Sequence, residues 1–124
     1  MRPFTLADLA EVNSWWKARK QPVRPASYLP KYGYIQPGVA AGWLFRTDSC
    51  IGFLDDFVTN PKAPLMQRVM YLDGITRNLV ATAKRVGIKA LVVYTGNEGI
   101  WRRLGKVHGW KTPEGKRFYA VRVP

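Results

Sequence analysis

The chain has 124 residues, 47% of them hydrophobic and 13% aromatic, which suits one packed domain spanning residues 1–124 and excludes a disordered chain. Its single cysteine, Cys50, excludes an internal disulfide, and one histidine beside one cysteine provides no zinc-binding set, so we expect no metal. No window approaches the ~18 consecutive apolar residues of a membrane-spanning helix, and no signal-peptide pattern opens the chain. We therefore expect a cytoplasmic protein with no membrane contact.

Positive charge is the most unusual global property of the sequence. Twenty Lys and Arg residues against eight Asp and Glu give a formal net charge of +12, and the excess lies in residues 1–31 and 84–124. A field of this sign attracts polyanions, whether nucleic acid, an acidic protein or a phosphate-rich cofactor. A basic, well-solvated surface that only keeps the protein soluble is the equally ordinary interpretation.

The N-terminal quarter predicts a short strand, a helix and a loop. A strand at residues 2–6 precedes an amphipathic helix that Thr5 or Asp8 can cap. Residues 21–31 contain three prolines, which exclude a regular element because each proline ring removes a backbone donor. The aromatic side chains of residues 21–34 are suited either to an acceptor lid or to a homodimer contact.

Three strand-like runs follow, separated by turn signals, at residues 33–36, 40–47 and 51–59. Strict alternation along the third run places Leu54, Asp56 and Val58 on one face. Asp55 then lies on the opposite face, so each face of this strand is expected to hold one carboxylate.

A long helix and a buried strand form the next unit. After Asn60 and a proline, apolar residues recur every three or four positions from Leu65 to Val86, and Gly87 ends the pattern as a left-handed cap. The fully apolar run at residues 90–94 is typical of a buried parallel strand. The sequence therefore predicts a strand, helix, strand crossover.

The C-terminal segment predicts a second helix at residues 98–106 with Asn97 at its start, followed by a closing hairpin that ends near residue 123. Asn97 is expected to hold the turn before the helix or to contact a cofactor. His108, beside the glycine that ends the helix, is expected to be a surface residue.

This element order resembles the fold of the GCN5-related N-acetyltransferases (GNAT). The segments CIGFLDDFVTNP, GIKALVVYTGN and IWRRLGKVHGW are similar to the strand before the family's long helix, the strand after it, and its last helix. The AAGWLF and VTNP segments also resemble acetyltransferase-like proteins of tailed phages, which implies host cytoplasm or virion as the location. The resemblance implies an α/β (α+β) GNAT-like acyl-CoA N-acyltransferase fold, with a mixed sheet of six or seven strands flanked by three helices.

The resemblance also implies an acetyl-CoA site between two parallel strands that splay apart, with the pyrophosphate at the turn that opens the long helix. The family places glycines in that turn, but this chain has Pro64, Leu65 and Met66 there, and proline offers no amide. Cofactor binding is therefore expected to be retained, weakened or lost. The implied cofactor contacts are Phe57, Val58, Thr59, Lys62, Gln67, Arg68 and Asn97.

Acetyl transfer to an amine requires a base for the ammonium proton and a donor for the departing thiolate. Asp55 or Asp56 is the best available base, although one ion-paired and one solvent-facing aspartate is the simpler interpretation. The family often supplies its acid from a tyrosine on the last helix, where this chain has Leu104. Tyr94 or Tyr71 can replace it, although an aromatic residue at such a position is more often part of the core.

Two functions therefore stay open. One is an acetyl-CoA-dependent N-acetyltransferase that acts on an amine acceptor with full or reduced activity. The other is a catalytically inactive GNAT-like protein that binds nucleic acid or an acidic protein partner through a basic face. The residues expected to form this face are Arg102, Arg103, Lys106, Lys111, Lys116 and Arg117.

Overall fold

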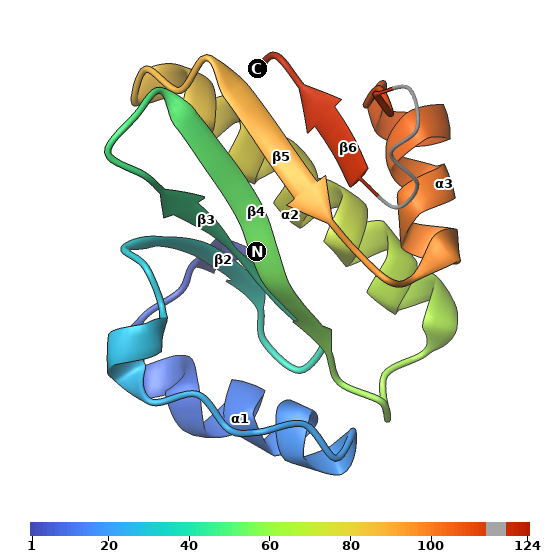
Figure 1. Ribbon diagram of the computed structural model, residues 1–124. Coiled ribbons are helices and arrows are strands. Elements are labelled where there is room, and N and C mark those ends of the chain that lie inside the picture. The colour runs from blue at the N-terminus through green and yellow to red at the C-terminus, as the bar shows by residue number, and fades with distance from the viewer. Residues whose placement is uncertain (114–118) are drawn as a thin grey trace.

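The protein, described by a computed structural model at residues 1–113 and 119–124, is built on one mixed β-sheet with α-helices on both faces (Figure 1). The predicted α+β class, with six strands and three α-helices in the described residues, is confirmed. No helix in this part of the chain has both the length and the hydrophobicity to cross a membrane. The strands are β1 (Arg2–Pro3), β2 (Tyr32–Gln36), β3 (Ala40–Arg46), β4 (Ile51–Thr59), β5 (Ala90–Tyr94) and β6 (Tyr119–Arg122), and the helices are α1 (Leu9–Ala18), α2 (Leu65–Arg85) and α3 (Glu98–His108).

The sheet follows chain order, β1-β2-β3-β4-β5-β6, and all its pairings are antiparallel except that of β4 with β5. The single parallel pairing is the one that α2 connects, because a parallel neighbour can be reached only by a crossover. In Figure 1, α2 passes behind β4 and β5. The predicted strand, helix, strand unit is confirmed.

Two hydrophobic cores lie on opposite faces of the sheet. The larger core joins the sheet to α2 and α3 and contains Leu54 and Leu79. The smaller core joins the sheet to α1 and contains Trp16, Trp43 and Val58. The rings of Trp16 and Trp43 stack at a centroid distance of 5.7 Å. These two cores fix α1 on one face and α2 and α3 on the other.

The pairing of β3 with β4 contains a β-bulge. Ala41 lies opposite Val58, whereas Trp43 lies opposite Asp55, so β4 has one residue more than β3 between these two pairs. Asp56 lies in this stretch with a φ of 56°, in the left-handed region that few residues other than glycine adopt and that aspartate tolerates better than most. The bulge therefore turns the backbone at the residue proposed from sequence as a base.

The bulge reverses the alternation of side chains along β4. Leu54 packs in the α2 core and Val58 packs in the α1 core, so the prediction that they share a face is wrong. Phe57 turns to the α2 side instead and lies against Gly42, where an added Cβ would be only 2.5 Å from the Phe57 ring. A glycine in β3 thus makes room for the altered course of β4.

β4 and β5 separate after Phe53, just ahead of the bulge. They pair at only three positions, Ile51 with Ala90, Gly52 with Leu91, and Phe53 with Val92. β4 then continues to Thr59, and β5 ends at Tyr94. Among the residues that the structure describes, residues 54–59 of β4 therefore have no partner strand on the β5 side. This divergence creates the space for the site described below.

The long helix α2 begins at Leu65, and the preceding residues form its lead-in. The Asn60 side chain holds this turn, because its amide oxygen accepts the Lys62 N–H at 3.0 Å and its amide nitrogen donates to the Gly38 carbonyl at 3.0 Å. Gly87 follows the helix with a φ of 86°, which confirms the predicted left-handed cap.

Candidate functional site

A cleft of about 740 Å³ opens where β4 and β5 separate. Its walls come from β4, the N-terminal half of α2, the end of β5 and α3, together with the end of α1 and the segment after it. Because α1 and α2 lie on opposite faces of the sheet, the cleft reaches from one face to the other through the gap between the strands. It therefore has two sides from which two molecules can meet.

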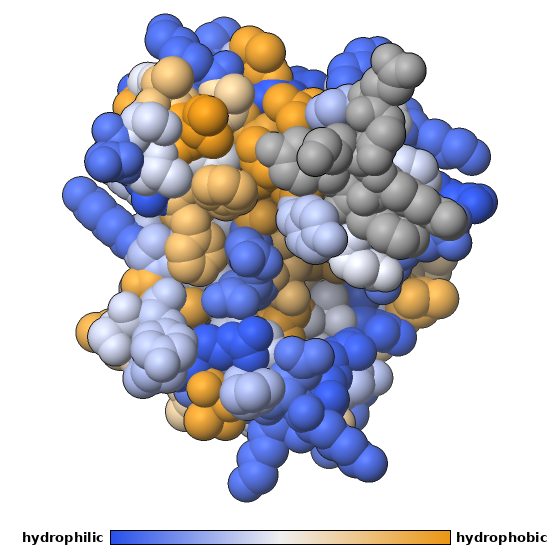
Figure 2. All heavy atoms as spheres, viewed as in Figure 1, coloured by the Kyte–Doolittle hydropathy of each residue, from blue (hydrophilic) through white to orange (hydrophobic). Residues whose placement is uncertain are grey.

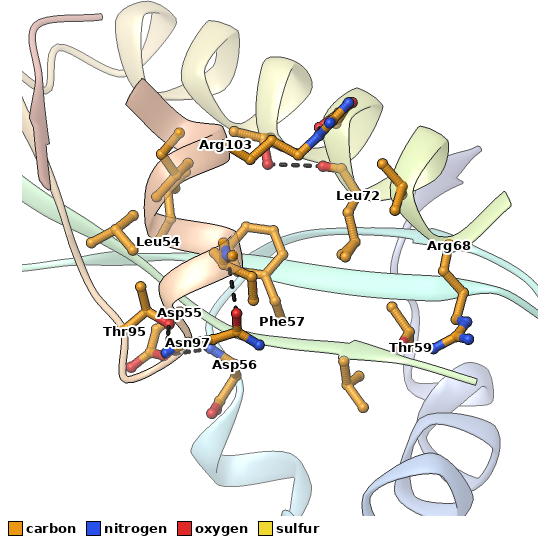
Figure 3. A pocket seen from close by; sticks show the side chains of 18 of the residues that line it. Leu54, Asp55, Asp56, Phe57, Thr59, Arg68, Leu72, Thr95, Asn97 and Arg103 are labelled. Carbon is orange, nitrogen blue, oxygen red and sulfur yellow. Dashed lines mark hydrogen bonds and ion pairs between the residues drawn. The ribbon is translucent and has the colours of Figure 1, made fainter. Parts of the chain in front are cut away.

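The polar side chains of the cleft are distributed along its length. Figure 3 draws Asp55, Asp56 and Asn97 toward one end and Thr59 and Arg68 toward the other. Asp55 is exposed, and its carboxylate accepts the backbone N–H of Asp56 at 2.7 Å. The two aspartates proposed from sequence as bases are thus both in the cleft, in different environments.

Asp56 is half-buried beside a cation. The Arg24 guanidinium donates to its carboxylate at 3.3 Å and lies over the Trp16 ring, 4.3 Å from the ring centroid. Burial raises the pKa of Asp56 above its usual range, and the attraction of Arg24 only partly opposes this. The pattern of one paired and one solvent-facing aspartate, which sequence reasoning gave as the simpler interpretation, is present. The raised pKa still distinguishes Asp56 from an ordinary ion-pair partner.

A third carboxylate, Asp73 of α2, lines the cleft on its other side. Arg103 donates to both of its oxygens, at 2.8 and 2.5 Å, and His108 Nε2 lies 3.0 Å from one of them. These contacts lower the pKa of Asp73 to about 2, with Arg103 as the main cause and burial opposing it. The His108 side chain is only 6% exposed, so the prediction of a surface histidine is wrong.

Sequence reasoning missed Asp73 altogether. It is the sole acidic residue of α2, and it stands beside the apolar stripe at a position next to Leu72. A lone carboxylate beside a buried stripe is a usable signal, because such a group needs a cationic partner from another element. The partner, Arg103, comes from α3, thirty residues further along the chain.

The N-terminal turn of α2 borders the cleft through Leu65 and Arg68. Pro64 is its N-cap residue and forms no side-chain cap, so the first-turn N–H groups, including those of Met66 and Gln67, have no intrahelical acceptor. The side chains of Leu65 and Met66 are 63% and 80% exposed. They therefore leave the gap between the strands open, although they stand where the GNAT pattern has glycines.

The proposed cofactor contacts divide into two groups. Phe57, Val58, Thr59, Arg68 and Asn97 line the cleft, whereas Lys62 and Gln67 are not part of its lining.

Two of the lining residues already have structural roles. Asn97 accepts the Ile100 N–H at 3.1 Å and so caps α3, which confirms its predicted role in the turn. The Arg19 guanidinium donates to the Thr59 carbonyl at 3.1 Å and to its hydroxyl at 2.6 Å.

Tyr94, the proposed acid, lines the cleft at the end of β5 and is 73% exposed, so the expectation of a core aromatic is wrong at this position. Tyr71, its alternative, is outside the lining and packs partly buried against the α2 core. Of the two, only Tyr94 is placed to act on a molecule in the cleft.

The proposed basic face is interrupted by ion pairs. Arg102 pairs with Glu98 at 2.8 Å, one helical turn away, and Arg103 is held by Asp73. Lys106 and Lys111 are exposed, whereas Lys116 and Arg117 lie outside the described residues. Figure 2 shows hydrophilic side chains spread widely over one face of the molecule. Two of the four described cations therefore have their charge compensated locally.

The chain matches no protein-family model and no curated protein sequence. It is similar in structure to N-acetylglutamate synthase from Neisseria gonorrhoeae complexed with coenzyme A and L-arginine, with a TM-score of 0.73 and 19% identity over 98% of this chain and 32% of that one. It is also similar to Rv2747 from Mycobacterium tuberculosis in complex with CoA and NLQ, with a TM-score of 0.67 and 15% identity over 92% of this chain and 72% of that one.

The chain thus spans about a third of the length of the synthase. At these identities the likeness establishes the fold, and function has to be argued from the site. Both similar structures contain bound coenzyme A. The mixed six-stranded sheet, with its three helices and its diverging parallel strands, is the GNAT acyl-CoA N-acyltransferase fold.

Proposed function

We propose that this protein is an N-acetyltransferase that transfers an acetyl group from acetyl-CoA to an amine acceptor. The observation that carries the proposal is the separation of β4 and β5 after three paired residues, with a cleft that crosses the sheet at that point. Such a cleft lets a thioester enter from the α2 side and an amine from the α1 side. The two similar structures, both complexed with coenzyme A, support this assignment.

The cleft has the features that a pantetheine arm and a pyrophosphate require. The unpaired edge of β4 offers backbone groups to an extended amide chain, as an exposed sheet edge does for a peptide. The uncapped N-terminal turn of α2 favours an anion, and Arg68 beside it adds a positive charge. Pro64 has no backbone N–H to donate, but it occupies the N-cap position, so the N–H groups of the first helical turn that follows it are still present.

Acetyl-CoA supplies an activated acetyl group in its thioester when bound. We assign Asp56 as the base that takes the proton from the acceptor ammonium, because its raised pKa suits proton uptake. The cleft residues would hold the thioester so that the freed amine nitrogen can bond to its carbonyl carbon while the carbon–sulfur bond breaks. We assign Tyr94 as the group that gives a proton to the departing sulfur and takes back the second proton, which the nitrogen loses on becoming an amide.

Titration of acetyl-CoA into the full chain by calorimetry tests the cofactor half of this proposal, and release of free thiol with an amine present tests the transfer. The variant Arg68→Glu is expected to weaken acetyl-CoA binding by about 10- to 100-fold, because it reverses the charge beside the phosphate site. Arg77→Glu is the matched control, since Arg77 lies exposed on the same helix and outside the cleft. Absence of both heat and thermal stabilisation at millimolar acetyl-CoA would exclude the proposal.

The alternative of a polyanion-binding protein has weaker support, because Arg102 and Arg103 are already paired. An affinity for DNA or heparin that falls steeply with salt is the result it predicts. The similarity to tailed-phage proteins, the cytoplasmic location and the homodimer stay predictions from the sequence.

A further inference from the structure

The α1 side of the cleft contains two cations and two carboxylates. Arg19 and Arg24 come from the end of α1 and the segment after it, and Asp55 and Asp56 come from β4. Under the proposed function this is the side that the amine acceptor enters. Its charge pattern therefore carries information about the acceptor.

Arg24 is held in a fixed position at this mouth. Its backbone N–H donates to the Asn13 side chain at 2.8 Å, and the Asn13 amide donates back to the Arg24 carbonyl at 2.9 Å. Its guanidinium lies over the Trp16 ring and also donates to the Pro22 carbonyl. A guanidinium fixed in this way loses little side-chain entropy when it binds a planar anion.

The contact of Arg24 with Asp56 differs from the two ion pairs that hold the buried aspartates of the described chain, Asp8 and Asp73. Arg2 binds both oxygens of Asp8, at 2.8 and 2.7 Å, and Arg103 likewise binds both oxygens of Asp73. Arg24 reaches only one oxygen of Asp56, at 3.3 Å. The bidentate geometry that satisfies both partners is absent there, so each retains capacity to bind a ligand.

We propose, on the basis of the proposed function, that the acceptor is a small amino acid whose α-carboxylate binds Arg24 and whose ammonium lies at Asp56. Binding of such a zwitterion replaces the single long contact between Arg24 and Asp56 with two ion pairs, one between Arg24 and the ligand carboxylate and one between Asp56 and the ligand ammonium. The raised pKa of Asp56 is consistent with this exchange, since the carboxylate is incompletely stabilised without a ligand.

Acceptors of other classes satisfy only part of this site. A simple alkylamine pairs with Asp56 but draws it away from Arg24, whose side chain is only 19% exposed and would be left without a carboxylate. The side chain of a lysine within a protein also leaves Arg24 without a partner, because it carries an amine but no free carboxylate. The geometry thus favours a free amino acid over a macromolecular acceptor.

Thiol release at saturating acetyl-CoA, measured with the standard L-amino acids one by one, tests the inference directly. For the best acceptor we expect its α-carboxamide to be used with a kcat/KM lower by about 10- to 100-fold, because the charged contact with Arg24 is lost. The variant Arg24→Gln should reduce the kcat/KM for the amino acid by a similar factor, mainly through KM. It should also abolish the preference for the acid over the carboxamide.

Arg46→Gln is the matched control, because it removes the same charge from an exposed residue outside the cleft lining. It should leave the preference unchanged, and acetyl-CoA affinity by calorimetry should be unaltered in both variants. If Arg24→Gln does not fold, the comparison of acid with carboxamide in the unaltered protein still decides the question.

Equal use of acid and carboxamide, or acetylation of alkylamines and peptide lysines in preference to amino acids, overturns this inference and leaves the acetyltransferase proposal intact. Failure to bind acetyl-CoA overturns the proposed function itself.

Discussion

Asp56 and Asp73 line the same cleft, and each faces an arginine, yet the two carboxylates are in opposite electrostatic states. Asp73 has two oxygens bound by Arg103 and a further contact from His108, and its pKa is lowered to about 2. Asp56 has one longer contact with Arg24, and its pKa is raised by burial. Both residues are aspartates beside an arginine, so the difference between their pKa values comes from the number and geometry of their hydrogen-bond partners and from burial.

Within this one cleft, Asp73 has a structural role and Asp56 is suited to a chemical one. Asp73 joins α2 to α3 and keeps one wall of the cleft in place. Because its negative charge is stabilised by these contacts, its carboxylate has little tendency to accept a proton. Asp56 sits on a bulged backbone with its charge only partly compensated. A carboxylate whose charge is only partly compensated is suited to proton transfer, whereas a carboxylate with both oxygens hydrogen-bonded is suited to holding two helices together.

Asp56→Asn should have the largest effect, on activity. We expect kcat/KM for acetyl transfer to fall by about 100-fold or more, because the base is lost while the acceptor site keeps its shape. The free energy of unfolding should change by less than about 1 kcal/mol, since asparagine tolerates the left-handed backbone and its amide oxygen can still accept the single hydrogen bond from Arg24.

Asp55→Asn is the matched comparison for this variant, and we expect it to cost less than about tenfold in kcat/KM, because Asp55 is exposed and positioned only to hold the Asp56 amide. Thiol-release kinetics and urea unfolding measure the two quantities. A larger loss in Asp55→Asn than in Asp56→Asn would reverse the assignment of the base.

Asp73→Ala should show the converse pattern. We expect the free energy of unfolding to fall by about 2 kcal/mol, because a part-buried bidentate ion pair and the His108 contact are removed together. Glu98→Ala, which breaks the exposed pair with Arg102, should cost less than about 0.5 kcal/mol. Chemical denaturation of the three proteins checks this difference, and equal stabilities would show that the Asp73 cluster does not hold the helices together.

Acid titration of stability should show the smallest effect. The pKa values of Asp73 and Asp8 are lowered from 3.8 to about 2 by their arginine partners. Their stabilising contribution is therefore complete above about pH 4 and is lost as the pH falls toward 2. We expect Asp73 to account for about 1 kcal/mol of this loss, after allowance for solvent screening of the half-exposed Arg103.

Urea unfolding of the unaltered protein and of Asp73→Ala between pH 5 and pH 2.5 measures this contribution, because the growing net positive charge acts on both proteins alike. The stability difference between them should shrink as the pH falls. A difference that stays constant across this range would mean that Asp73 does not gain its stabilisation from the ionised form.

Much of the scaffold could be predicted from local sequence. The apolar run ALVVY marked β5, the stripe from Leu65 marked α2, and Gly87 marked its end, because each signal depends on neighbours a few residues apart. The cleft could be predicted only through the resemblance to the GNAT family. Of the expected cofactor contacts, the three on β4 together with Arg68 and Asn97 proved to line it, whereas Lys62 and Gln67 did not.

The states of the site residues depended on contacts across the fold. The sequence by itself determined the order of the elements and the two-faced burial of β5, since periodicity and turn residues act locally. Tertiary structure alone decided that Asp56 occupies a bulge, because this requires the register with β3 and the space above Gly42. It also decided which carboxylate has both oxygens hydrogen-bonded. Arg24 and Arg103 are 32 and 30 residues away from their aspartates in the sequence and reach them only after the two helical layers have packed.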